Sequence, residues 1–147
     1  MNGKAWIIGL LAVVVCVPAF AQLPDDAERK VIDSLMMRIA ALEQTGRELH
    51  EKYPDSKTAE AQKACKADFP DLPEQARNLR GEAAALQTLA FKVHLSMAAN
   101  DLVQCVDCLG TVTACDGAAA SLERARDQMK RMQDYAKKLQ AGQDDPS

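Results

Sequence analysis

Apolar residues recur at alternating spacings of three and four positions through most of the chain, a pattern typical of amphipathic helices that pack on one another. The first such stripe predicts a helix from about residue 25 to residue 53, with Gly46 in one slot of the repeat. Asp25 and Glu28 have the spacing of a capping box, and Pro54 ends the helix. At ~1.5 Å per residue, its length is about 44 Å. Its stripe consists of Ile32, Leu35, Ile39, Leu42, Leu49 and Tyr53.

A second, shorter helix is expected from about Lys57 to Ala67. Asp55 or Ser56 can cap its start, and it must stop before Phe69 and Pro70 because proline disfavours helix in the preceding residue. This short helix carries Cys65.

The third helical segment begins at Asp71, where Glu74 follows at capping-box spacing and Pro73 fits the first turn. If the spacing of its apolar stripe continued beyond Met97, polar residues would face the neighbouring helix. A new apolar stripe begins there instead, displaced by one residue from the first. We therefore predict a break or a shift of register between Ser96 and Asp101, and a left-handed helix stop at Gly110. The first stripe is Leu72, Ala76, Leu79, Ala83, Leu86, Ala90, Val93 and Met97, and the second is Ala98, Leu102, Cys105 and Leu109.

The last helix is expected to begin near Thr113 and Asp116, which again have capping-box spacing, and to end at Gly142. No segment alternates as a strand would, and only residues 109–113 are doubtful. The predicted fold is all-α, a three- to four-helix antiparallel bundle over residues 22–141 with a frayed tail over 142–147. The last stripe is Ala118, Leu122, Ala125, Met129, Met132, Ala136 and Leu139.

The first 21 residues have the layout of a secretory signal peptide: Lys4, an apolar run over residues 5–17, Pro18, and a small-x-small sequence that ends at Ala21. The alternative is a membrane anchor, but the run falls short of the roughly 20 apolar residues that a spanning helix needs. Lipidation at Cys16 is disfavoured because three valines precede it. We therefore expect a periplasmic or secreted protein that has no membrane contact after cleavage.

Cleavage after residue 21 leaves 126 residues, enough for one domain with its own core. With Lys4 removed, 17 basic residues face 21 acidic ones, a net charge of −4. Nucleic acid and anionic membrane surfaces attract clustered Lys and Arg, so this balance argues against both as partners.

Four cysteines remain after cleavage, and in an exported chain they favour two disulfides. A hairpin that turns between residues 111 and 112 places Cys108 opposite Cys115, and closing so short a loop contributes about 2–3 kcal/mol. Cys105 lies one turn earlier on the same face, so Cys105 with Cys115 is the second choice. The bundle should therefore contain a disulfide-stapled helical hairpin.

Cys65 is harder to place, because one straight helix from residue 72 to residue 109 would put Cys105 about 45 Å away. Three outcomes remain: a break near Asn100 folds the chain back, Cys65 pairs with a second molecule in a homodimer, or Cys65 stays free. The shifted stripe favours the break.

Cys105 and Cys108 also form a CxxC sequence, which is found in thiol oxidoreductases and metal sites. Asp107 and a helix C-terminus both raise thiol pKa, which disfavours a redox role. A copper(I) or zinc site could use Cys105, Cys108 and Cys115, with Cys65 or a methionine as a further ligand. Disulfides are the better prediction in an oxidising compartment, and no cofactor is expected.

His50 and His94, the only histidines, belong to no catalytic or metal-binding motif and are expected to be structural or solvated. The carboxylates are scattered over helix surfaces, so no catalytic residue is predicted. The methionines are assigned to the core by their helical spacing. The resulting hypothesis is a non-enzymatic exported protein that binds an unknown envelope or secreted protein, as an inhibitor, chaperone or adaptor. The alternatives are a copper or zinc protein using the cysteines and, third, a thiol oxidoreductase.

Overall fold

A computed structural model describes residues 23–54 and 58–143. The predicted signal peptide over residues 1–21, the cap candidates Asp55 and Ser56, and residues 144–147 of the predicted tail lie outside this description. Every regular element in the described ranges is a helix, which confirms the all-α prediction. The helices are α1 (Asp26–Lys52), α2 (Ala59–Asp68), α3 (Leu72–Ala84), α4 (Leu89–Cys105) and α5 (Val112–Gln143).

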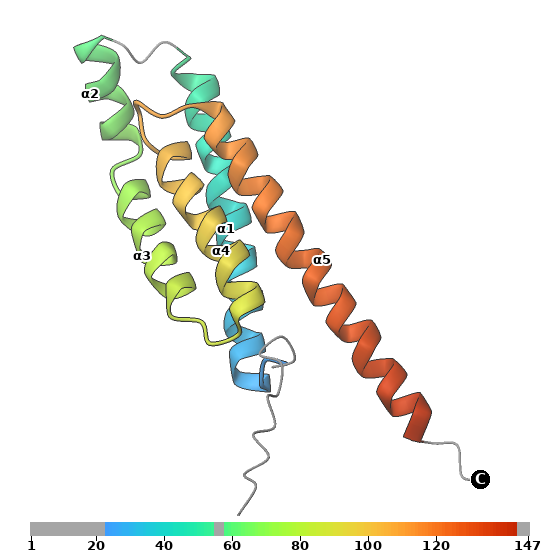
Figure 1. Cartoon of the computed structure of the whole chain (residues 1–147). Coiled ribbons are helices and arrows are strands. Elements are labelled where there is room, and N and C mark those ends of the chain that lie inside the picture. The colour runs from blue at the N-terminus through green and yellow to red at the C-terminus, as the bar shows by residue number, and fades with distance from the viewer. Residues whose placement is uncertain (1–22, 55–57, 144–147) are drawn as a thin grey trace, which may run out of the picture.

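Four of the helices form an up-down-up-down bundle, in which α1 and α4 run one way and α3 and α5 run the other (Figure 1). The short α2 lies at the end of the bundle where α1 ends and α5 begins. Helix α4 packs against α1, α3 and α5, while the far end of α5 extends past the bundle (Figure 1). No helix in the described ranges is long and apolar enough to cross a membrane.

Helix α1 matches its prediction. The Glu28 amide donates to Asp25 Oδ1 at 2.7 Å, which caps the helix as the capping-box spacing indicated. The apolar stripe is the buried face of the helix, and Gly46 lies within it. The Leu49 carbonyl oxygen accepts from the amide of Tyr53, the residue at which the helix ends.

Helix α2 begins two residues later than predicted. Thr58 caps it, because the Ala61 amide donates to Thr58 Oγ1 at 3.2 Å. Lys52 and Tyr53, at the end of α1, both donate to Asp68 at the end of α2. These contacts fasten the two helix ends to each other.

The predicted break between Ser96 and Asp101 is wrong, because α4 runs through those residues without interruption. The chain turns instead at residues 85–88, between α3 and α4. This corner changes the helical phase, so Val93 and Met97 leave the seam and are each 45% exposed. The core positions of α4 are Phe91, Leu95, Ala98, Ala99, Leu102 and Cys105.

Helix α5 begins at Val112 and continues through Gly142 to Gln143, so its end falls slightly later than predicted. Its stripe is buried only as far as Met129, and Leu139 is 51% exposed where the helix leaves the bundle. Gly110 does not adopt the predicted left-handed conformation, since no described glycine has positive φ. Glycine is needed there for space: a Cβ would lie 1.7 Å from the carbonyl oxygen of Gln104.

Candidate functional site

The four described cysteines form two disulfides at one end of the bundle, Cys65–Cys108 and Cys105–Cys115. The favoured pairing of Cys108 with Cys115 is therefore wrong, whereas the second choice, Cys105 with Cys115, is the one found. Cys105 is the last residue of α4 and faces α5 directly, with a Cα–Cα distance of 4.7 Å to Cys115. Cys108 lies in the following turn and reaches α2 instead.

The turn at residues 85–88 explains how Cys65 can reach Cys108. Helix α3 runs away from the α2 end of the bundle, and α4 runs antiparallel to it, back toward that end. The C-terminus of α4 therefore lies beside the C-terminus of α2 (Figure 1). The Cα atoms of Cys65 and Cys108 are 6.0 Å apart, so neither a second molecule nor a break near Asn100 is needed.

The two disulfides determine whether the cysteines can act as nucleophiles or metal ligands. Cys105 and Cys108 are not bonded to each other, so the CxxC sequence does not form its own disulfide. Cys65, Cys105 and Cys115 are fully buried, and Cys108 is nearly so. As bonded, the cysteines present no thiolate, and the described ranges hold no cluster of His, Cys, Asp or Glu suited to a metal ion.

His50 has a structural role at the disulfide-bonded end of the bundle. Its Nε2 lies 2.8 Å from the carbonyl oxygen of Cys105 and donates to it, since a carbonyl can only accept. This contact satisfies a carbonyl at the C-terminus of α4, where the helix has no partner of its own. His94 is half-buried on α4, and its Nδ1 has no hydrogen-bond partner in the described part of the chain.

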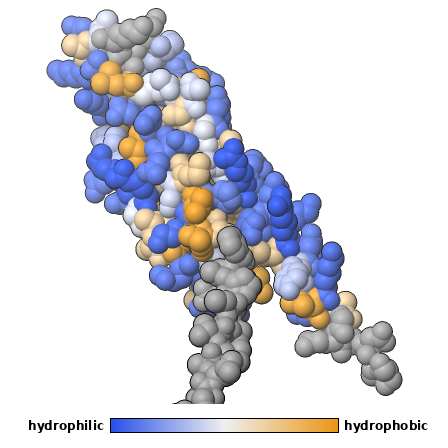
Figure 2. Space-filling view, viewed as in Figure 1, coloured by the Kyte–Doolittle hydropathy of each residue, from blue (hydrophilic) through white to orange (hydrophobic). Residues whose placement is uncertain are grey.

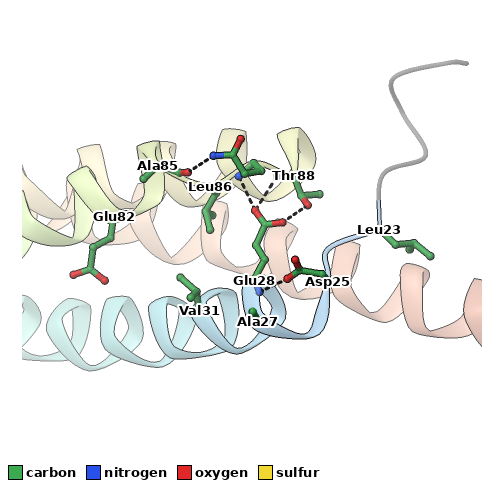
Figure 3. Close-up of a pocket in the computed structure, with 10 residues that line it drawn as sticks. Leu23, Asp25, Ala27, Glu28, Val31, Glu82, Ala85, Leu86 and Thr88 are labelled. Atoms are coloured by element: carbon green, nitrogen blue, oxygen red, sulfur yellow. Dashed lines mark hydrogen bonds between the residues drawn. The ribbon is translucent and has the colours of Figure 1, made fainter. Parts of the chain in front are cut away.

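An open depression of about 570 Å³ lies at the opposite end, between the start of α1 and the α3–α4 corner (Figure 3). The carboxylate of Glu28 points from α1 into the corner and accepts three hydrogen bonds. The donors are the Gln87 amide at 2.6 Å, the Thr88 amide at 2.9 Å and the Thr88 hydroxyl at 2.7 Å. Burial alone would raise the pKa of Glu28, but these bonds outweigh it and hold the pKa below its ordinary value.

The other acids of this depression also have partners. Asp25 caps α1, and Glu82 makes a two-pronged hydrogen bond with Arg38 at 2.6 and 2.7 Å. The pKa of Glu82 is lowered by this contact. Each carboxylate of the depression therefore either caps a helix or joins two helix segments.

An apolar surface runs along α4. Leu89, Val93 and Met97 follow one another at intervals of four residues, so they share one face of the helix, and they are 57%, 45% and 45% exposed. We call these three residues the α4 ridge. Figure 2 shows apolar residues along this side of the molecule with hydrophilic residues on both flanks.

The α4 ridge is a functional candidate that apolar spacing alone does not reveal. Val93 and Met97 continue the three-four spacing of α3 so regularly that the spacing predicts them to be core residues. The signal that could have separated them is the second apolar stripe of α4, which begins at Phe91 and already supplies a complete core face.

The disulfides, His50 and Glu28 all have structural partners, whereas the α4 ridge is a row of exposed apolar side chains on one helix face. A scan of protein-family models, a search of curated proteins and a search of solved structures find no match to the chain.

Proposed function

We propose that this chain is an exported, non-enzymatic helical protein that binds another envelope or secreted protein, and that the α4 ridge is its contact surface. The exposed row of Leu89, Val93 and Met97 is the observation that carries the proposal. Scattered apolar side chains are ordinary on protein surfaces, whereas a contiguous apolar row is typical of a binding site.

The size of the ridge suits an anchor within a larger interface. Full burial of an apolar side chain of this kind contributes about 1.5–3 kcal/mol, and each member of the ridge has about half its surface still to bury. Together they contribute on the order of 3 kcal/mol before the entropic cost of association. The rest of the affinity must come from neighbouring polar contacts.

The non-enzymatic part of the proposal is supported by how the reactive side chains are used. The cysteines are in disulfides, His50 binds a carbonyl oxygen, and Glu28 is held by three donors. No observation favours the metal-binding or oxidoreductase alternative over the binding protein, because both would need thiolates.

Export is supported by two independent features. Disulfides form and persist in oxidising compartments such as the periplasm or the extracellular space. The sequence of residues 1–21 is typical of a secretory signal peptide. A binding protein in such a compartment has envelope or secreted proteins as its available partners.

Photo-cross-linking tests the proposal. A benzoyl-phenylalanine is placed at Val93, and in a matched control at Lys63, which is exposed on α2. The full-length protein is irradiated in its native compartment. We expect one discrete protein adduct from position 93, absent from position 63 and abolished by Met97→Glu. The absence of any adduct specific to position 93 would contradict the proposal.

A further inference from the structure

We infer, resting on the proposed function, that the partner presents an amphipathic helix with acidic residues on its flanks, and that this helix lies along the α4 ridge. The inference comes from unpaired arginines that border the ridge on both sides. One pair lies on α5 and the other on α3.

The α5 border is fixed by a close helix contact. A Cβ on Gly117 would lie 2.7 Å from Asp101 Oδ2, so the side of α5 that carries Gly117 faces α4. Arg124 and Arg131 follow Gly117 at intervals of seven residues, which places them on the same side of α5. Because α4 and α5 are antiparallel, Arg124 lies near the level of Val93.

The α3 border is fixed by the ion pair between Glu82 and Arg38, which shows which side of α3 faces α1. Arg80 is two residues from Glu82, about 200° around the helix, and so lies on the opposite side, toward the outer face of α4. Arg80 and Val93 are about equally far from the corner at residues 85–88, so they lie at one level. Arg77 lies one turn further along, near the level of Met97.

These four arginines are free to meet an external charge. All are exposed, and none takes part in an ion pair within the described ranges. Lys92, half-buried on α4, adds a fifth positive charge near the ridge. The acids close to this face are Asp101 on α4, Asp127 between the two arginines of α5, and Glu74 one turn from Arg77 on α3. Although the whole chain is acidic, this face therefore carries more positive than negative charge. The arginines are Arg77, Arg80, Arg124 and Arg131.

The shape of the ridge favours a helix as the occupant. Leu89, Val93 and Met97 form a straight row with one residue per turn, about 12 Å long. A partner helix laid along such a row can place its own apolar stripe against it by ridges-into-grooves packing. Its flanking positions then face the arginines, where Asp or Glu would be attracted and Lys or Arg repelled.

Two other occupants fit this face less well. A second copy of the chain, packed about a two-fold axis on the same face, would bring arginine borders together. A lipid surface would attract the arginines, but the face continues from the ridge into Asn100 and Gln104, both exposed. Their amide groups would lose hydrogen bonds among acyl chains, whereas they can bond a polar protein partner.

The test uses the position-93 cross-linker in the full-length protein in its native compartment. A border variant carries Arg80→Glu and Arg124→Glu, and a matched control carries Lys63→Glu and Lys66→Glu, two exposed lysines of α2. We expect the border variant to lower the yield of the protein adduct about tenfold, since two attractions become repulsions, while the control leaves it within about twofold. Mass spectrometry should place the attachment site on an amphipathic helix flanked by Asp or Glu.

The outcomes separate this inference from the proposed function. An adduct that persists in the border variant, or that maps to a partner segment without acidic flanks, overturns the inference while the proposed function stands. Attachment to a second copy of this chain or to a lipid also overturns it. If position 93 gives no specific adduct in the unaltered protein, both the proposed function and the inference fail. Circular dichroism of each variant verifies that the helical fold is retained.

Discussion

Gly46 of α1 lies directly against Cys105 of α4, so closely that a Cβ at Gly46 would stand 2.3 Å from Cys105 Sγ and 3.1 Å from its carbonyl oxygen. One turn further along α1, His50 bonds that same carbonyl oxygen. The end of α4, the Cys105–Cys115 disulfide and α1 thus meet at a point where only glycine leaves enough room.

The Gly46 contact predicts opposite effects for two glycine substitutions. Gly46→Ala forces a methyl group against a sulfur that the disulfide holds in place, and should lower the free energy of unfolding by about 2 kcal/mol. Gly81→Ala is the control, because Gly81 lies inside α3 with nothing near its Cβ position. It should raise stability by about 0.5–1 kcal/mol through helix propensity alone. Urea unfolding of both variants measures the difference, and a neutral Gly46→Ala variant would contradict the packing described here.

The disulfide pairing makes a prediction for digestion with endoproteinase Asp-N without reduction. Cleavage before Asp107 separates Cys105 from Cys108, while Cys108 and Cys115 stay in one fragment. The observed pairing keeps the Cys65, Cys105 and Cys108/Cys115 fragments in one three-peptide cluster. A Cys108–Cys115 bond would instead release that fragment alone. Tandem mass spectrometry of the cluster then identifies whether Cys108 or Cys115 is bonded to Cys65.

Glu28 predicts a pH dependence. Its pKa is lowered in the folded state from an ordinary value of 4.5, because the bonds from Thr88 and Gln87 outweigh its burial. The ionised carboxylate therefore contributes its full stability above pH 4.5 and loses it as the pH falls through the lower folded value. Glu28→Gln should cost about 1.5 kcal/mol at neutral pH, and less as the solution is acidified below the ordinary pKa.

Urea unfolding between neutral and acid pH measures this difference. Glu51→Gln is a suitable control, since Glu51 is exposed on α1 and takes part in no hydrogen bond or ion pair in the described ranges. The result that would refute the role of Glu28 is a cost that stays constant, or grows, as the pH is lowered.

Much of the fold could be predicted from local signals. The start of α1, its buried stripe and its end followed from Asp25, a regular three-four repeat and Pro54, because capping and amphipathic spacing act over a few residues. The all-α class and the positions of α2 and α5 followed in the same way, but the division of residues 72–109 into the antiparallel helices α3 and α4 did not. The cysteines indicated correctly which end of the bundle would be cross-linked.

The α3–α4 corner could not be predicted, because it depends on a contact distant in sequence. Residues 85–88 contain neither glycine nor proline, and the Thr88 amide finds its acceptor in Glu28, at a sequence separation of 60. The α4 ridge adds to the difficulty, because Val93 and Met97 keep the three-four spacing of the α3 core residues across the turn. An apolar surface kept for a partner cannot be told from a core by spacing alone.

The difference between an exposed and a buried position on α4 can be measured as stability. Val93 and Leu95 are two residues apart on α4, yet Val93 is 45% exposed and Leu95 is fully buried. Val93→Ser should lower the free energy of unfolding by about 1 kcal/mol or less, because only about half of the Val93 side chain is removed from water in the folded state. Leu95→Ala should cost about 2–5 kcal/mol through lost burial and a cavity between α4 and its neighbours. Thermal or urea unfolding of the purified variants compares them, and a large loss for Val93→Ser would return Val93 to the core and remove the basis of the α4 ridge.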